Sequence, residues 1–264
     1  MSILSSFRPL VIFACMAAST ASCTTPEGAD PSPDPGNGNG TGQAGYLIGK
    51  VSDPSGKPLS KATVYINNTV IKDRSAETSS AADGTYKIAM VAGLGQWIAK
   101  GFILKQYNGR VYKLLLDPSN DDSFSAEEKP VRNFQWKLQG HVPDLSLNQY
   151  YGGSAELYKD PNEIEIDDTE NVEFTFTPEG ALIDGSQGKT LKLRGGKAGT
   201  QNRNRLIDIP IGRYKITAVY LTTGKALKVK DAWNDAPYAS SAIIDFHGTE
   251  ESYRANEMGI AYRQ

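Results

Sequence analysis

The chain of 264 residues has only two cysteines, Cys15 and Cys23, and both lie close to its N-terminus. Everything after Cys23 therefore lacks disulfides, thiol nucleophiles and thiolate metal ligands. A folded region without thiols suits an oxidising compartment of the cell envelope. Its stability must come from the burial of apolar side chains.

Histidine is equally scarce, since only His141 and His247 are present. Acyl transfer needs a nucleophile beside a positioned base, and neither histidine is accompanied by a Gly-x-Ser-x-Gly or Ser-x-x-Lys element. The run His141-Val142-Pro143-Asp144 has aspartate where a His-x-x-Glu metal motif has glutamate, and it lacks a second ligand histidine. We therefore expect no enzyme activity, no catalytic residue, no metal site and no cofactor.

The sequence also lacks a surplus of basic charge, because 28 Lys and Arg residues stand against 30 Asp and Glu residues. Proteins that bind nucleic acid neutralise phosphates with a basic surface, and no such stripe is present. Nucleic acid is therefore not an expected partner. Long apolar runs are missing as well, since the run from Leu10 to Ala18 is far shorter than the roughly 20 residues of a spanning helix.

What the N-terminus does contain is a secretory pattern of one basic residue, the apolar run and then small residues, which predicts a signal peptide over residues 1–22. The four residues at the end of this pattern, Thr20-Ala21-Ser22-Cys23, resemble the lipobox of bacterial lipoproteins. That resemblance implies that Cys23 becomes the acylated N-terminus, so that the membrane is a partner through the lipid. Thr20 stands where the family usually has leucine, and ordinary cleavage nearby is the alternative.

Residues 23–45 are rich in proline, glycine, asparagine, threonine and acidic side chains, with almost nothing to bury. Such a composition predicts a disordered tether. A coil of about 22 residues has a mean reach of roughly 25 Å, which is enough to lift a folded domain off the lipid headgroups.

After the tether, short runs rich in β-branched and aromatic residues alternate with turn formers, and no long amphipathic helix is evident. The clearest period-two segments are 133–138, 172–177 and 214–220, and each can bury one face. In the first of them we expect Trp136 to point inward with its neighbours Phe134 and Leu138.

These patterns predict an all-β protein with two antiparallel β-sandwich domains. Turn formers cluster between residues 139 and 153 and place a boundary near Gly140. The first sandwich is then expected over 46–140 and the second over 141–264, both of ordinary size for this architecture.

The first of these domains carries a specific pattern. It begins with Gly49-Lys50-Val51-Ser52-Asp53-Pro54-Ser55-Gly56-Lys57-Pro58-Leu59, continues through Ala62-Thr63-Val64, and reaches Asp83-Gly84-Thr85-Tyr86-Lys87-Ile88. It resembles the carboxypeptidase regulatory-like family, which implies a transthyretin-like (prealbumin-like) seven-stranded sandwich. Two later stretches, Arg132–Gly140 and Tyr150–Gly153, are similar to segments that follow this module in Bacteroidota-type surface lipoproteins.

The segment Asp231–Tyr238 is the best candidate for ligand binding, because aromatic faces in a polar loop can stack on sugar rings while Asp and Asn bind hydroxyls. Its candidate residues are Trp233, Asn234, Asp235 and Tyr238. The alternative is that Trp233 or Tyr238 folds back and caps the end of the sandwich.

Two other charged patterns have simpler interpretations. The acidic loops 117–122 and 160–168 are expected to be solvated turns, with structural calcium as the alternative. Alternating cations in 189–194 and 225–230 are typical of edge strands that discourage unwanted pairing, with ligand capture as the alternative.

Together these features predict a non-enzymatic cell-envelope lipoprotein, at the outer membrane or cell surface, that acts as a binding or scaffolding module. The alternative is a glycan-binding accessory protein of a polysaccharide-handling system. A glycan or an envelope protein is then the expected partner besides the membrane.

The lipid anchor is directly testable. The substitution Cys23→Ser should give an unprocessed or soluble product, because the thiol is the expected acyl acceptor and firm anchoring takes several acyl chains. Detergent phase partitioning measures this, and equal partitioning of variant and wild type would contradict lipidation.

Overall fold

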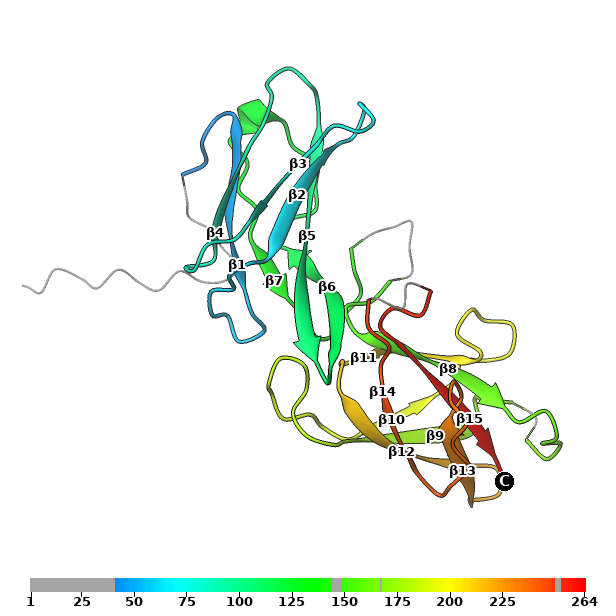
Figure 1. Ribbon diagram of the computed structural model, residues 1–264. Coiled ribbons are helices and arrows are strands. Elements are labelled where there is room, and N and C mark those ends of the chain that lie inside the picture. The colour runs from blue at the N-terminus through cyan, green and yellow to red at the C-terminus, as the bar shows by residue number, and fades with distance from the viewer. Residues whose placement is uncertain (1–40, 144–148, 167, 250–252) are drawn as a thin grey trace, which may run out of the picture. The chain divides into compact units, whose positions relative to one another are not determined.

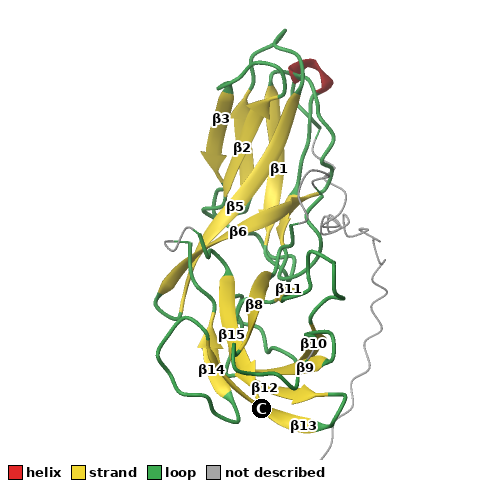
Figure 2. Cartoon of the chain, turned by 90° about the vertical axis from the view of Figure 1, so that its right-hand side faces the viewer, coloured by secondary structure: helices red, strands yellow, loops and turns green. Residues whose placement is uncertain are grey.

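The computed structural model describes residues 41–143, 149–166, 168–249 and 253–264, and all of these belong to one compact unit. The predicted signal peptide, Cys23 and most of the predicted tether lie outside these ranges. The described residues form strands, loops and a single 3-10 turn, η1 (Ala126–Glu128), so the prediction of an all-β fold is confirmed (Figure 2). Among them, no helix has the length and apolarity needed to cross a membrane.

The first β-sandwich contains seven strands, which run from blue to green in Figure 1. They are β1 (Tyr46–Ser52), β2 (Thr63–Asn68), β3 (Ser75–Ser79), β4 (Thr85–Ala89), β5 (Trp97–Tyr107), β6 (Arg110–Pro118) and β7 (Phe134–Trp136). The strand order is β3-β2-β5-β6-β7-β1-β4, so β7 connects the layer of β2, β3, β5 and β6 to the layer of β1 and β4. All pairs are antiparallel except β1 with β7, where Val51 lies opposite Phe134.

Alternation along the strands decides which side chains enter the first core. Val64 and Ile66 of β2 are completely buried. Phe134 and Trp136 of β7 are each only 2% exposed, and Leu138 packs against the same cluster. The predicted inward face of residues 133–138 is therefore confirmed. Each such apolar side chain stabilises the fold by roughly 1.5–3 kcal/mol relative to an exposed position.

The turn before β4 shows why its residues are needed. Thr85 donates from its backbone N–H and its hydroxyl to Asp83 Oδ1, at 3.0 and 2.7 Å, and these bonds hold the pKa of Asp83 below its ordinary value. Gly84 has a φ of +78°, and a Cβ there would lie 2.5 Å from the carbonyl oxygen of Val51. Only glycine fits at this position. The strand that follows buries Tyr86, as predicted.

The second β-sandwich contains eight strands. They are β8 (Gly153–Lys159), β9 (Val172–Pro178), β10 (Leu191–Arg194), β11 (Arg205–Ile209), β12 (Arg213–Tyr220), β13 (Lys225–Asp231), β14 (Ala242–Asp245) and β15 (Glu257–Arg263). Their order is β10-β9-β12-β13-β15-β8-β11, with β14 paired to β12. β8 and β15 form its one parallel pair of named strands among the described residues. The chain therefore has two all-β sandwich domains.

The second core also follows the predicted period of two. Val172, Phe174 and Phe176 are completely buried on β9, and Tyr214 of β12 stacks edge-on against Phe176 with ring centroids 5.6 Å apart. The inward residues of segment 214–220 are all buried. Aromatic pairs of this geometry add to the stability that area burial provides.

The prediction that residues 189–194 and 225–230 form edge strands is confirmed for the first segment and wrong for the second. β10 is the last strand of its sheet, and its Lys192 and Arg194 contact Glu173 of β9 at 2.9 and 3.2 Å. β13, which holds the cations of 225–230, lies between β12 and β15. Alternating cations mark a strand with one solvated face, and an interior strand of a sandwich has such a face as well.

The hairpin of β5 and β6 hydrogen-bonds to the segment that follows β14. The Tyr112 hydroxyl and the Arg110 guanidinium both donate to the carbonyl oxygen of Phe246 at 2.7 Å, and the Thr249 N–H donates to Val111 at 2.6 Å. Tyr112 is completely buried, and burial raises its pKa to about 12. The predicted boundary near Gly140 lies between the strands of the two sandwiches, and it stays a prediction.

The inward orientation of Trp136 on β7 can be tested by its effect on stability. Trp136→Ala should destabilise the protein by about 3–5 kcal/mol, because truncating a buried tryptophan loses transfer energy and leaves a cavity. Trp233→Ala is the comparison, since Trp233 is only half-buried and should cost less. Denaturant unfolding of both variants measures this. A negligible loss at Trp136 would show that the strand faces the other way.

Candidate ligand-binding site

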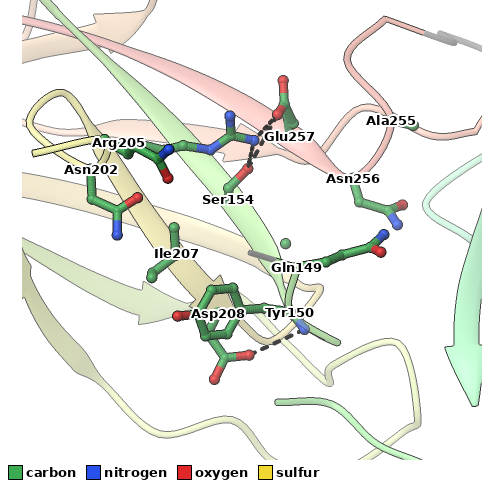
Figure 3. Close-up of a pocket in the computed structure, with 13 residues that line it drawn as sticks. Gln149, Tyr150, Ser154, Asn202, Arg205, Ile207, Asp208, Ala255, Asn256 and Glu257 are labelled. Carbon is green, nitrogen blue, oxygen red and sulfur yellow. Dashed lines mark hydrogen bonds and ion pairs between the residues drawn. The ribbon is translucent and has the colours of Figure 1, made fainter. Parts of the chain in front are cut away.

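A polar hollow of about 520 Å³ opens on the second sandwich. The start of β8, the loop before β11, β11 itself and the loop before β15 contribute to its walls (Figure 3). Most of its side chains carry hydrogen-bonding groups. The lining residues are Gln149, Tyr150, Gly152, Gly153, Ser154, Gln201, Asn202, Arg205, Ile207, Asp208, Ala255, Asn256 and Glu257.

One wall is an ion pair between Arg205 and Glu257. The Arg205 guanidinium donates to the Glu257 carboxylate and, at 2.7 Å, to the Ser154 hydroxyl (Figure 3). Ser154 and Glu257 are opposite each other in the parallel pair of β8 and β15, which explains why the three groups meet. The side chain of Glu257 is only 15% exposed, so its charge is neutralised by a close partner rather than by bulk water.

A second wall is organised by Asp208. Its carboxylate accepts hydrogen bonds from the N–H groups of Gly140, at 2.9 Å, and Gly152, at 3.2 Å, while its carbonyl oxygen accepts one from Gln139 Nε2 at 2.7 Å. The register of β11 with β8 shifts between Leu206 and Ile209, and Asp208 has a φ of +60°. Aspartate tolerates this left-handed conformation better than most residues. The bulge turns the carboxylate toward Gly140 and Gly152, the two ends of segment 140–152, which we call the linker.

The remaining lining groups are mainly uncharged amides. Asn256 donates from Nδ2 to the carbonyl oxygen of Lys113 at 3.1 Å, while its buried Oδ1 has no hydrogen-bond partner among the described residues. Gln149, Gln201 and Asn202 add further amide groups. Since both carboxylates and the guanidinium already have partners, the hollow offers neutral donors and acceptors. Such a lining suits a neutral ligand with many hydroxyls better than an anion.

The sequence-predicted Trp233 lies apart from this hollow. Its indole packs against His247, with ring centroids 4.7 Å apart, and against the Arg254 guanidinium, 4.1 Å from the ring centroid. A Cβ at Gly259 would come within 2.6 Å of the indole, so glycine makes room for the ring. Burial, together with nearby arginines, lowers the pKa of His247. This packing is the fold-back arrangement that the sequence left as the alternative.

The other three predicted loop residues also lie outside the hollow. Asn234 hydrogen-bonds within its own loop, with Asp231 Oδ2 at 3.0 Å, and Asp235 is exposed. Tyr238 is half-buried, and the Arg263 guanidinium lies 4.5 Å from its ring centroid. The loop remains a predicted ligand site, and Cys23, the predicted lipid site, is outside the described residues.

The acidic loops have partners within the protein. Asp117 accepts a hydrogen bond from the Tyr151 hydroxyl at 2.6 Å and pairs with Lys137, and Asp160 lies 3.7 Å from Arg263. In the described part of the chain, no three His, Cys, Asp or Glu side chains form a cluster that could hold a metal ion. Asp167 of the second loop lies outside that part.

Comparison with known proteins gives neither a family nor an activity. No protein-family model matches the chain, and no curated protein matches it. Among solved structures, the Bacillus anthracis TIE protein is similar at 11% identity over 83% of this chain and 33% of its own, with a TM-score of 0.31. A C-terminal fragment of the pilus adhesin SpaC from Lactobacillus rhamnosus GG matches at 9% identity, over 83% of this chain and 97% of its own, with a TM-score of 0.22.

A third similar structure is a mutant of the major pilin from Streptococcus pyogenes, at 6% identity over 83% of this chain and 96% of its own, with a TM-score of 0.21. The chain spans about a third of the length of the Bacillus protein. Scores this low carry no argument about function. The class of protein is therefore the one that the strands themselves define, a two-domain all-β sandwich protein with a polar hollow on its second domain.

The ion pair in the hollow can be tested by a double-mutant cycle. Arg205→Met leaves the largely buried carboxylate of Glu257 without its main partner and should cost about 1–3 kcal/mol. Adding Glu257→Gln should recover part of that loss, because no charge is then left uncompensated. Lys192→Met, which removes a pair with an exposed lysine, is the control and should cost less. Strict additivity of the Arg205 and Glu257 effects would contradict the described contact.

Proposed function

We propose that the chain is a lipid-anchored, non-enzymatic protein of the cell envelope, held through Cys23 at the outer membrane or cell surface, whose two sandwiches act as a binding or scaffolding module. The lipobox-like step from Thr20 to Cys23 and the polar composition of residues 24–45 support the anchor. The all-β fold supports a role in binding, because sandwiches present loops and sheet faces to partners.

We also propose that residues 46–140 form a transthyretin-like domain of the carboxypeptidase regulatory-like kind and that residues 141–264 form the second domain. Seven strands and the Asp83-Gly84 turn support the first assignment. A further support is Ala62, which is completely buried where the pattern places a small residue at the start of β2.

The observation that carries a binding function is the polar hollow. The amide groups of Gln149, Gln201 and Asn202 in its lining suit a ligand that supplies both donors and acceptors. A neutral, hydroxyl-rich ligand such as a glycan meets that requirement. This favours the glycan-binding form of the module over pure scaffolding.

A glycan array tests the proposal and separates the two candidate sites. The array would be probed with the soluble Cys23→Ser chain and with three further variants of it, Gln149→Ala, Asn202→Ala and Trp233→Ala. We expect binding that falls at least several-fold in the two hollow variants and little in Trp233→Ala. Within the described part of the chain, the side chains of Gln149 and Asn202 make no hydrogen bond to the protein. Their removal should therefore leave the stability unchanged.

The opposite pattern, loss only in Trp233→Ala, would move the site to the Asp231–Tyr238 loop. If all four chains are folded and none binds any glycan on the array, the result would count against glycan binding and favour scaffolding. Circular dichroism melts of each variant provide the control for folding.

A further inference from the structure

Three exposed aliphatic side chains lie on two loops at one end of the first sandwich. Val70 and Ile71, in the loop between β2 and β3, are 80% and 38% exposed, and Val91, in the loop between β4 and β5, is 58% exposed. We refer to these three residues as the apolar tip. Single exposed apolar residues are common on protein surfaces, but a group of them on adjacent loops needs an explanation.

The two loops are held together by one side chain. Asn68 donates from Nδ2 to the carbonyl oxygen of Leu94, at 2.8 Å. Its Oδ1 accepts hydrogen bonds from the N–H groups of Val70, at 3.0 Å, and Ile71, at 2.7 Å. The backbone that presents the tip is therefore fixed in place before any partner arrives, and little conformational entropy is lost on contact.

The tip lies at the end of the sandwich where the chain enters from its N-terminus. Tyr46, the first residue of β1, is opposite Ala89, the last of β4. The Met90 N–H donates to the carbonyl oxygen of Gly45 at 2.8 Å, so residues 41–45 arrive beside the loop that carries Val91. The loop that carries Val70 and Ile71 is at the same end, because Asn68 is opposite Trp97, the first residue of β5.

We propose that the apolar tip inserts into the interface of the membrane that holds the acyl chains of Cys23; this rests on the lipid anchor of the proposed function. The predicted tether joins this end of the sandwich to Cys23, and a coil with a mean reach of roughly 25 Å also takes up shorter separations, so this end can contact the headgroups. The charges beside the tip are mixed, since exposed Lys72 and Arg74 flank exposed Asp73 and Glu127 accepts a hydrogen bond from Gly93 N–H. The proposed contact therefore rests on the aliphatic side chains and the anchor.

A lipid surface fits the tip better than a protein partner. Three side chains at the ends of loops offer far less area than the roughly 800 Å² per partner of a standard protein interface. A bilayer needs no shaped complement and accepts aliphatic groups at its boundary. The tip would then act as a second contact beside the lipid and fix the orientation of the first sandwich.

The test uses the full-length acylated protein in vesicles of phosphatidylethanolamine and phosphatidylglycerol. Since acylation occupies the thiol of Cys23 and no other cysteine follows it, a cysteine introduced at Val91 is a unique labelling site. An environment-sensitive fluorophore there should shift to shorter wavelength when vesicles are added and should be quenched by spin-labelled headgroups. The same label at Ile164, which is 87% exposed on the second sandwich, is the matched control and should change little.

Equal fluorescence responses at the two positions in an acylated, vesicle-bound chain would contradict membrane insertion of the apolar tip. They would not contradict lipid anchoring through Cys23. A shift at Val91 that appears without vesicles and grows with protein concentration would mean contact between copies of the chain, and would also contradict membrane insertion of the tip. Mass spectrometry reports acylation separately, and a chain without lipid would contradict the anchor and the tip together.

Discussion

The carboxylate of Asp208 fixes the geometry on which the candidate site depends. It accepts N–H groups from Gly140 and Gly152, so both ends of the linker are held against β11. A Cβ on Gly152 would lie 2.7 Å from the Asp208 carbonyl carbon, so glycine allows this close approach. The left-handed backbone conformation of Asp208 is unusual for a residue other than glycine. Here this conformation directs the carboxylate toward the two backbone N–H groups.

The first sandwich also makes contacts that bear on the same site. The carbonyl oxygen of Lys113, on β6, holds the side chain of Asn256, and the neighbouring hydroxyl of Tyr112 holds Phe246. Asn256 is therefore positioned by a strand of the first sandwich, although it lines a hollow of the second. In this respect the first sandwich supports the candidate site on the second, as the proposed module requires.

The strands could be predicted from the sequence because their signal is local. Alternation in 133–138 and 172–177 marks one buried face, and burial of Trp136 and Phe174 follows directly from it. The hollow could not be predicted in this way. Arg205, Ser154 and Glu257 come from three separate parts of the chain, and they meet because β8 and β15 pair in parallel, a long-range choice that no local pattern encodes. The position of β13 inside its sheet was missed for the same reason.

Trp233 illustrates a related limit. An aromatic residue in a polar loop has the same sequence signature whether its ring stacks on a ligand or on the protein. Gly259, on the paired strand β15, is what allows the ring to pack inward beside His247.

The polar hollow and the Trp233 loop are the two candidate ligand sites of the proposed function, and the geometry favours the hollow. Hydrogen–deuterium exchange of the soluble Cys23→Ser chain distinguishes them most directly. Exchange would be measured with and without a neutral oligosaccharide that binds the chain on the glycan array. We expect slower exchange in residues 201–208 and 254–258, with residues 231–238 unchanged. Slower exchange confined to 231–238 would show that the hollow is not the ligand site.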